Sequence, residues 1–269
     1  HINSPSDIKG LSDKEITALC SEIRERLVST VTENGGHLSS NLGVVELSVA
    51  IHRVFDSPKD HIIFDVGHQS YVHKLLTGRN KDFDTLRKAG GLSGFPKRSE
   101  SIHDAFGTGH SSTSLSAGLG FAEADKLSGS DAYTVVVLGD GAFTGGMIHE
   151  ALNNCRKALR LILVVNENEM SISKNEGHFA RLLTKLRTSR GYSHTKSVLD
   201  RTLTHIPLVG EPVKNGLSKV KKGVKRVLYS NNYFEPMGLN YFGPADGHDE
   251  ALMEQLLRSA KQKGGCSII

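Results

Sequence analysis

The stretch VVVLGDGAFTGG, from Val135 to Gly146, begins as a buried strand and then places one aspartate between two glycines. Its first four residues are apolar and mostly β-branched, which is typical of a strand covered on both faces in a parallel sheet. The glycines let the backbone turn sharply beyond the strand. Asp140 therefore stands at the tip of a hydrophobic strand, where it either caps the next helix or binds a ligand.

A second polar residue is expected beside Asp140. The pattern predicts a strand over 135–138, a helix over Met147–Ala158 and a strand over 161–165, a β-α-β unit whose strands are parallel neighbours. Asn168 follows the second strand, so it shares with Asp140 the carboxyl edge of the sheet, where open α/β folds bind ligands. A carboxylate and an amide oxygen suit Mg²⁺, which takes further ligands from waters and phosphates. From spacing alone, a helix cap and a strand-end turn explain the two residues equally well.

The rest of the chain alternates helices and strands. Ser12 and Glu15 form a capping box for a helix that ends at Gly35-Gly36. A short buried strand begins at His61 and runs into a loop at Gly67. Further helices are expected over about 43–55, 112–127 and 249–261, and a last strand at 266–269. This order predicts an α/β fold with a mostly parallel sheet flanked by helices.

Composition limits the broad class of protein. The 269 residues are 38% hydrophobic and 23% charged, which is ordinary for a globular protein. No apolar run reaches roughly 18 residues, so no membrane span is expected, and HINSPSDIKG does not resemble a secretory signal. The chain does not begin with Met, so we expect the true start to lie upstream. Three widely spaced cysteines favour a reducing cytoplasm over a disulfide framework.

The net charge of +4 is unevenly distributed. The segment from Arg181 to Arg226 contains twelve Lys and Arg but only two acidic residues, a local net charge of +10. The other residues therefore have a net charge of −6. Nucleic-acid binding through this segment is a rival function, but its single aromatic residue, Tyr192, offers little base stacking. We interpret residues of about 175–235 as a mobile basic insertion over the active site, and expect neither nucleic acid nor membrane as a partner.

The stretch GTGHSSTS precedes the helix expected from about Ser112. Free N–H groups and the dipole at a helix N-terminus favour an anion. His110 and Ser111 add side-chain donors, so a diphosphate fits this loop. The alternative is that Ser111 or Ser112 only caps the helix, and the two roles are compatible.

Four motifs in order, FDVGHQSYVHKLLTGR, GLSGFPKRSES, GTGHSSTS and NENEMSIS, resemble the 1-deoxy-D-xylulose-5-phosphate synthase family of thiamine-diphosphate-dependent, transketolase-like enzymes. The resemblance runs from residue 1 to residue 269. It implies that Asp140, Asn168 and the backbone carbonyl of Met170 hold Mg²⁺ on the cofactor diphosphate. It also assigns to cofactor binding Gly109, His110, Ser111, Gly141 and Ala142. Two departures, Glu167 where the family often has Asp and Ser39 where it often has Gly or Ala, touch none of these positions.

Three histidines, His37, His68 and His110, each follow a glycine. Imidazole is the side chain best suited to proton transfer near neutral pH. The resemblance implies that His37 and His68 are catalytic proton donors and that His68 also touches the cofactor. It further implies that Ser40 contacts the phosphosugar and that Ile172 packs under the thiazolium ring, although a core position explains Ile172 equally well. The remaining candidates, His52, His61, His73 and His149, are expected to be structural or superficial.

The function implied by the resemblance is the condensation of pyruvate with D-glyceraldehyde 3-phosphate to 1-deoxy-D-xylulose 5-phosphate and CO₂. Thiamine diphosphate and Mg²⁺ are the implied cofactors, and a homodimer is the implied full-length assembly. The pyrimidine-binding and C-terminal domains of the family are absent from this chain, so we expect residues 1–269 to form the diphosphate-binding domain and to be inactive alone. The alternative is a cofactor-binding fragment or regulatory scaffold with no activity of its own.

Overall fold

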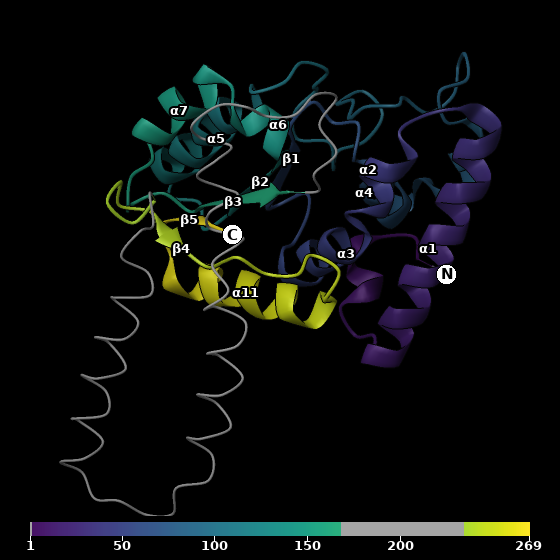
Figure 1. Ribbon diagram of the computed structural model, residues 1–269, viewed down its shortest axis with the longest axis horizontal. Coiled ribbons are helices and arrows are strands. Elements are labelled where there is room, and N and C mark those ends of the chain that lie inside the picture. Colours follow the sequence, from purple (N-terminus) through teal and green to yellow (C-terminus); the bar gives the residue numbers. More distant parts are fainter. Residues whose placement is uncertain (1, 168–233) are drawn as a thin grey trace, which may run out of the picture. The chain divides into compact units, whose positions relative to one another are not determined.

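A five-stranded, fully parallel sheet forms the centre of the described compact unit (Figure 1). The computed structural model describes residues 2–167 and 234–269, nearly all of which belong to one compact unit. In spatial order the strands are β1 (His61–Phe64), β2 (Thr134–Gly139), β3 (Leu161–Asn166), β5 (Cys266–Ile268) and β4 (Asn240–Tyr241). The predicted α/β class and the parallel β2–β3 pair are confirmed.

Helices α3 (Val45–Val54) and α11 (Glu250–Lys263) cover one face of the sheet (Figure 1). Every second strand residue points to this side, because side chains alternate along a strand. The resulting core joins residues of the two helices to the inward residues of β1, β2 and β3, among them Leu47, Ile51, Leu257, Phe64, Val135, Val137 and Ile162. Fully burying such side chains stabilises a fold by about 1.5–3 kcal/mol each.

Helix α5 (Ser114–Ser128) covers the opposite face together with α7 (Gly146–Asn153). Gly118 of α5 lies directly over β2. A Cβ atom added there would stand 2.5 Å from Cγ2 of Val136, so only a glycine allows the helix to lie this close to the strand. The short helix α6 (Asp140–Phe143) connects β2 to α7.

The N-terminal layer packs beside the sheet around a second core. Helix α1 (Asp13–Asn34) begins at the predicted capping box, in which Glu15 accepts hydrogen bonds from the backbone N–H and the hydroxyl of Ser12. Gly35, with φ +74°, ends it as predicted. The smaller helices of this part are η1 (Pro5–Ile8), α2 (Leu38–Leu42), α4 (Tyr71–Lys74), η2 (Leu75–Arg79) and η3 (Asn80–Thr85). The second core contains Ile23, Leu27, Val49, Tyr71 and Phe83.

Two helix boundaries and one strand are the main differences from the sequence prediction. Helix α5 begins at Ser114 rather than Ser112, because Ser112 has a left-handed backbone with φ +67°. Helix α7 ends at Asn153 instead of Ala158, where a turn closes through the N–H of Cys155 and the carbonyl of Leu152. Strand β4 was not expected, and its two residues are too few to show a period.

Some expectations concern the whole chain. Among the described residues, no helix combines the length and apolar character that crossing a membrane requires. All three cysteines are free thiols, as expected. The basic insertion of about 175–235 falls almost entirely outside the described residues.

Replacing Gly118 with Val should lower the free energy of unfolding by about 1–3 kcal/mol, because the new side chain meets Val136 in the packed core. Gly120 is the matched control on the same helix, since a Cβ there meets nothing within 4 Å. Gly120→Ala should leave stability unchanged or raise it by up to about 1 kcal/mol, because alanine is the better helix former. Urea unfolding of both variants measures the effect, and equal stability of the two would contradict this packing.

Candidate active site at the carboxyl edge of the sheet

The site begins where β2 and β3 end. The register pairs Gly139 with Asn166, so the residues that follow, Asp140 and Glu167, leave the sheet at the same edge. Asp140 is half-buried and is the first residue of α6. Gly141 is exposed, and a Cβ added to it would meet nothing within 4 Å, so the space above this turn is open. Three other predicted site residues, Asn168, Met170 and Ile172, lie outside the described residues.

The loop before α5 is fastened to the same edge. The hydroxyl of Ser112 donates a hydrogen bond to the carbonyl oxygen of Ala142 over 2.9 Å, which joins the loop to the turn that carries Asp140. Gly145 leaves room for this hydroxyl, because a Cβ at that position would collide with it. The three residues directly before Ser112 lie next to this hydrogen bond and are exposed: Gly109, His110 and Ser111.

The start of α5 is bound by a group that neither sequence-based alternative named. Neither Ser111 nor Ser112 caps the helix; its end is bound instead by Asp65, the residue after β1. The Asp65 carboxylate accepts hydrogen bonds from the backbone N–H of Ser112 (2.8 Å) and of Ser114 (3.1 Å), and from the Ser114 hydroxyl (2.6 Å). These helix-end donors are therefore not free to bind an external anion.

His37 and His68, the two catalytic candidates, lie next to each other. Their rings meet edge to face with centroids 5.2 Å apart. The buried side chain of Asn41 fixes both: its amide donates to the carbonyl oxygens of His37 (2.7 Å) and His68 (2.8 Å), and its oxygen accepts from the N–H of Tyr71 (2.8 Å). Ser40 lies one residue before this anchor on α2 and is half-buried.

The electrostatic environment keeps both imidazoles neutral. Burial lowers the pKa of His68, and the neighbouring His37 lowers it further. The pKa of His37 is also lowered, first by burial and then by the charge of Arg87. Nδ1 of His68 is buried and has no hydrogen-bond partner among the described residues. A neutral histidine with an unsatisfied ring nitrogen is suited to bind a ligand or exchange a proton.

The segment 92–104 closes one side of the site. Phe95 approaches His37 with ring centroids 6.3 Å apart, and Pro96 lies so close to Gly67 that no Cβ fits there. Two acids hold the segment from behind: Glu100 accepts from the N–H of Ser93 and Asp104 from the N–H of Lys97, each over 2.8 Å.

A buried polar network supports these acids. His73 Nε2 lies 3.1 Å from Asp104, and His73 Nδ1 lies 2.9 Å from His52 Nε2. Arg79 donates to both oxygens of Asp104 and to Glu100, which is also paired with Lys74. Burial alone would raise the pKa of Asp104, but hydrogen bonds from His73 and Arg79 outweigh it and hold that pKa well below its usual range. The prediction that His52 and His73 are structural agrees with these contacts.

Known proteins match the whole chain. The family profile described as 1-deoxy-D-xylulose-5-phosphate synthase covers residues 1–269. The chain belongs to the 1-deoxy-D-xylulose-5-phosphate synthase family. It is 51% identical over 265 residues to the enzyme of that name from Caldanaerobacter subterraneus subsp. tengcongensis, covering 98% of this chain and 43% of the relative. The synthase from Syntrophomonas wolfei is 52% identical over 265 residues, with 98% and 42% covered. The chain therefore spans less than half of the length of these relatives.

Solved structures support the same fold for this member of the synthase family. A transketolase mutant from Pichia stipitis superimposes with a TM-score of 0.67 at 18% identity, covering 96% of this chain and 36% of that one. Transketolase from Campylobacter jejuni gives a TM-score of 0.64 at 21% identity, with 96% and 38% covered. The synthase-family chain thus has a transketolase-like fold.

Sequence reasoning missed three polar residues of the synthase-family site, namely Asn41, Asp65 and Ser112. Asp65 and Ser112 stand inside motifs already noted, FDVGHQ and GHSSTS, and Asn41 directly follows the candidate Ser40. The signal available in the sequence was a small polar residue inside a motif. Once such a residue is buried by the fold, it needs hydrogen-bond partners.

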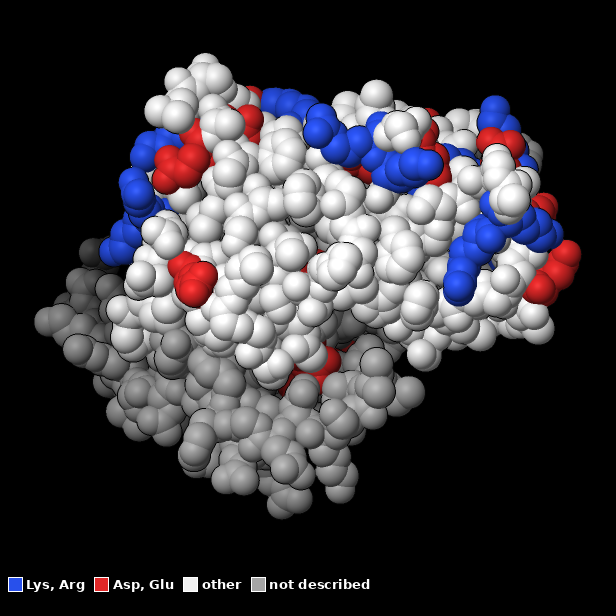
Figure 2. Space-filling view, turned by 90° about the horizontal axis from the view of Figure 1, so that it is seen from above, with Lys and Arg blue, Asp and Glu red and all other residues white. Residues whose placement is uncertain are grey.

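Figure 2 shows the distribution of charge on one face of the protein. Lys and Arg side chains lie along its upper and side borders, several of them beside Asp or Glu, and most of its middle carries neither sign of charge. The segment on which the nucleic-acid alternative rested, 181–226, lies outside the described residues.

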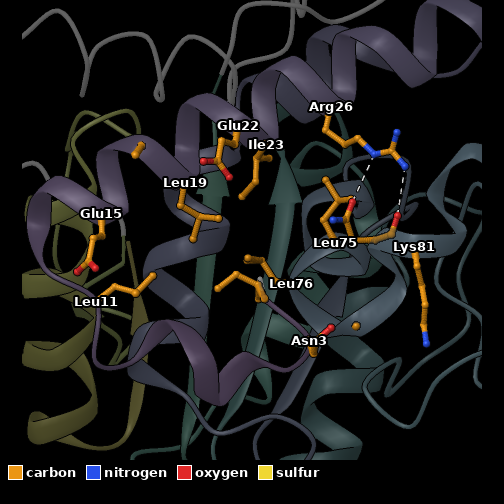
Figure 3. Close-up of a pocket in the computed structure, with 14 residues that line it drawn as sticks. Asn3, Leu11, Glu15, Leu19, Glu22, Ile23, Arg26, Leu75, Leu76 and Lys81 are labelled. Atoms are coloured by element: carbon orange, nitrogen blue, oxygen red, sulfur yellow. Dashed lines mark hydrogen bonds between the residues drawn. The ribbon is translucent and has the colours of Figure 1, made fainter.

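A separate pocket of about 850 Å³ lies in the N-terminal layer (Figure 3). Leu19 and Ile23 of α1 face Leu75 and Leu76 of η2 across it, and Arg26 closes one end through hydrogen bonds to Asn80. None of the predicted site residues lines this pocket, so the candidate active site is elsewhere.

Acid should weaken this synthase-family fold through the histidine network. Burial, followed by neighbouring charge, holds the pKa of His52 well below the ordinary value, and burial also lowers the pKa of His73. The unfolded chain therefore binds more protons than the folded one once the pH falls below about 6.5. From pH 6.5 to 5.5 His52, whose pKa is held well below its ordinary value, should reduce the free energy of unfolding by about 1 kcal/mol, and His73 should act in the same direction.

Urea unfolding at a series of pH values measures this effect. His52→Phe removes one titrating group, so its stability should fall less steeply with acid than that of the wild type, whatever its stability at neutral pH. Parallel pH profiles for the two proteins would show that His52 is protonated in the folded state.

Proposed function

We propose that this chain supplies the diphosphate- and Mg²⁺-binding half of a 1-deoxy-D-xylulose-5-phosphate synthase active site. The whole enzyme would condense pyruvate with D-glyceraldehyde 3-phosphate to give 1-deoxy-D-xylulose 5-phosphate and CO₂. The observation that carries the proposal is the hydrogen bond from Ser112 to Ala142, which brings the exposed loop 109–111 to the turn that begins with Asp140.

The described residues fit a bound diphosphate and metal ion. Asp140 offers a hard carboxylate oxygen of the kind that Mg²⁺ prefers, and Asn168 with the Met170 carbonyl would complete the protein ligands. Added Cβ atoms at Gly109 and Gly141 meet nothing within 4 Å, so backbone on both sides of the edge is open to a ligand. The buried Nδ1 of His68, which has no partner in the described part of the chain, offers a polar contact to the same ligand.

Bound thiamine diphosphate would supply the electron sink for decarboxylating a 2-oxo acid, while the protein orients groups and moves protons. His37 and His68 are neutral near pH 7, so each can give one ring proton and accept another. Asn41 fixes the backbone of both residues, and their rings lie with centroids 5.2 Å apart, so both side chains could exchange protons with one substrate. Ser40 would contact the phosphosugar, and Ile172 would pack against the cofactor ring.

Activity would depend on parts of the enzyme beyond this chain, which covers 43% of the Caldanaerobacter relative. We propose that the pyrimidine-activating glutamate and a third domain belong to those parts, and that the complete enzyme is a homodimer. The three free thiols are compatible with a reducing compartment, and we propose a cytoplasmic location. A cofactor-binding scaffold without activity remains the second candidate, and the chain's partial coverage of its relatives favours testing it.

Asp140→Ala should weaken Mg²⁺-dependent binding of thiamine diphosphate at least tenfold, because a metal ligand is lost at a strand tip rather than a core contact. Asp131→Ala is the matched control: Asp131 precedes the same strand at its opposite end, pairs with Lys59 and is 69% exposed. Calorimetric titrations with Mg²⁺ and with EDTA measure the effect. Tight, Mg²⁺-dependent binding by the Asp140 variant would exclude the metal role.

The 269-residue chain alone should show no synthase turnover. General acid–base help is typically worth about 10²–10⁴-fold, and positioning by the rest of the cleft about 7–11 kcal/mol. The assay supplies pyruvate, D-glyceraldehyde 3-phosphate, thiamine diphosphate and Mg²⁺, and follows CO₂ and the sugar phosphate. Robust turnover without a second polypeptide would mean that the pyrimidine-activating group lies within these residues.

A further inference from the structure

Asp65 is a buried carboxylate that the proposed chemistry does not use. Its side chain is 1% exposed, and it follows β1 directly at the carboxyl edge of the sheet. All three of its described hydrogen-bond donors, two backbone N–H groups and the Ser114 hydroxyl, are neutral. The positive end of the α5 dipole is therefore what compensates the charge of this buried carboxylate.

The three bonds also fix the shape of the preceding loop. Accepting from Ser112 and Ser114 at once holds the chain between them against β1, and Ser112 is kept in its left-handed conformation with φ +67°. A residue other than glycine or asparagine pays for this backbone in strain, so the surrounding contacts must impose it. In that conformation the Ser112 hydroxyl reaches Ala142.

Asp65 therefore links the three segments from which the site is built. It connects the end of β1 to the loop 109–111, and Ser112 passes the connection to the turn after β2. Among the described hydrogen bonds, only the one to Asp65 ties the backbone of Ser112 to the end of β1.

We propose that Asp65 is a positioning residue for anion binding. Its carboxylate occupies the N–H groups of Ser112 and Ser114 at the start of α5, and so holds loop 109–111 and the Asp140 turn where both can contact one diphosphate group. This inference rests on the proposed function, because the ligand is the diphosphate of the cofactor. It assigns anion recognition to the loop and the metal rather than to the helix end.

The loss of negative charge and the loss of acceptor geometry have opposite expected effects on the diphosphate affinity of Asp65→Asn. Removing a negative charge beside an anion site should by itself tighten diphosphate binding, because the repulsion between them is lost. Losing the acceptor geometry should weaken it, since an amide has one acceptor oxygen where the carboxylate used two. The sign of the change therefore separates the two effects.

The experiment titrates inorganic diphosphate with Mg²⁺ into the 269-residue chain by calorimetry. We expect Asp65→Asn to bind at least tenfold more weakly than the wild type. Ser114→Ala removes only the 2.6 Å hydroxyl bond and should cost a few-fold. Ser116→Ala, at an exposed position of the same helix, is the control and should change nothing.

A second readout separates positioning from general stability. In amide NMR spectra, the N–H resonances of Ser112 and Ser114 should shift in Asp65→Asn, while those of α11 stay in place. The affinities are compared at a temperature at which every variant is folded by circular dichroism.

Each outcome decides a different claim. If the wild type binds no diphosphate, the proposed function falls, and this inference falls with it. If the wild type binds and Asp65→Asn binds as tightly or more tightly, the positioning role is wrong while the proposed function stands. If Asp65→Asn does not fold, Ser114→Ala decides, and unchanged affinity in that variant overturns the proposal.

Discussion

Parallel pairing of β2 with β3 is the constraint on which the site depends. Six residue pairs, from Thr134 with Leu161 to Gly139 with Asn166, fix where both strands end. A slip of one residue would turn every inward side chain to the other face, so burial of the two cores locks this register. Because the register is locked, Asp140 and Glu167 leave the sheet together, and a ligand can be met from two strands at once.

Buried polar bonds then bring three loops to that edge. Asp65 holds the loop before α5, Asn41 holds the two catalytic candidates His37 and His68, and Asp104 holds the segment 92–104. Each of these side chains is buried and bonded to backbone groups. Buried polar groups that lose their partners cost about 1–3 kcal/mol, so each loop has one strongly preferred position. The site is therefore rigid on its β1 and β2 sides.

The histidine network shows how the fold tolerates buried charge behind this edge. Lys74 and Arg79 balance Glu100 and Asp104, which leaves no net charge for the histidines to neutralise. With His73 donating to Asp104 and His52 donating to His73, both rings stay neutral, and Nδ1 of His52 is left without a proton and without a partner among the described residues. Neutral histidines beside a balanced ion cluster make this support firm at neutral pH and weak in acid.

The sequence by itself determined most of the order of helices and strands, the family and the candidate residues of the site, because hydrophobic period, capping and short motifs are local. The Ser12–Glu15 box and the β2–β3 pair needed no tertiary knowledge. Only the tertiary structure decided which group binds the start of α5, since Asp65 and Ser112 are 47 positions apart in the chain. No period or spacing encodes such a contact; it arises when packing brings a buried acceptor to a helix end that must satisfy its free N–H groups.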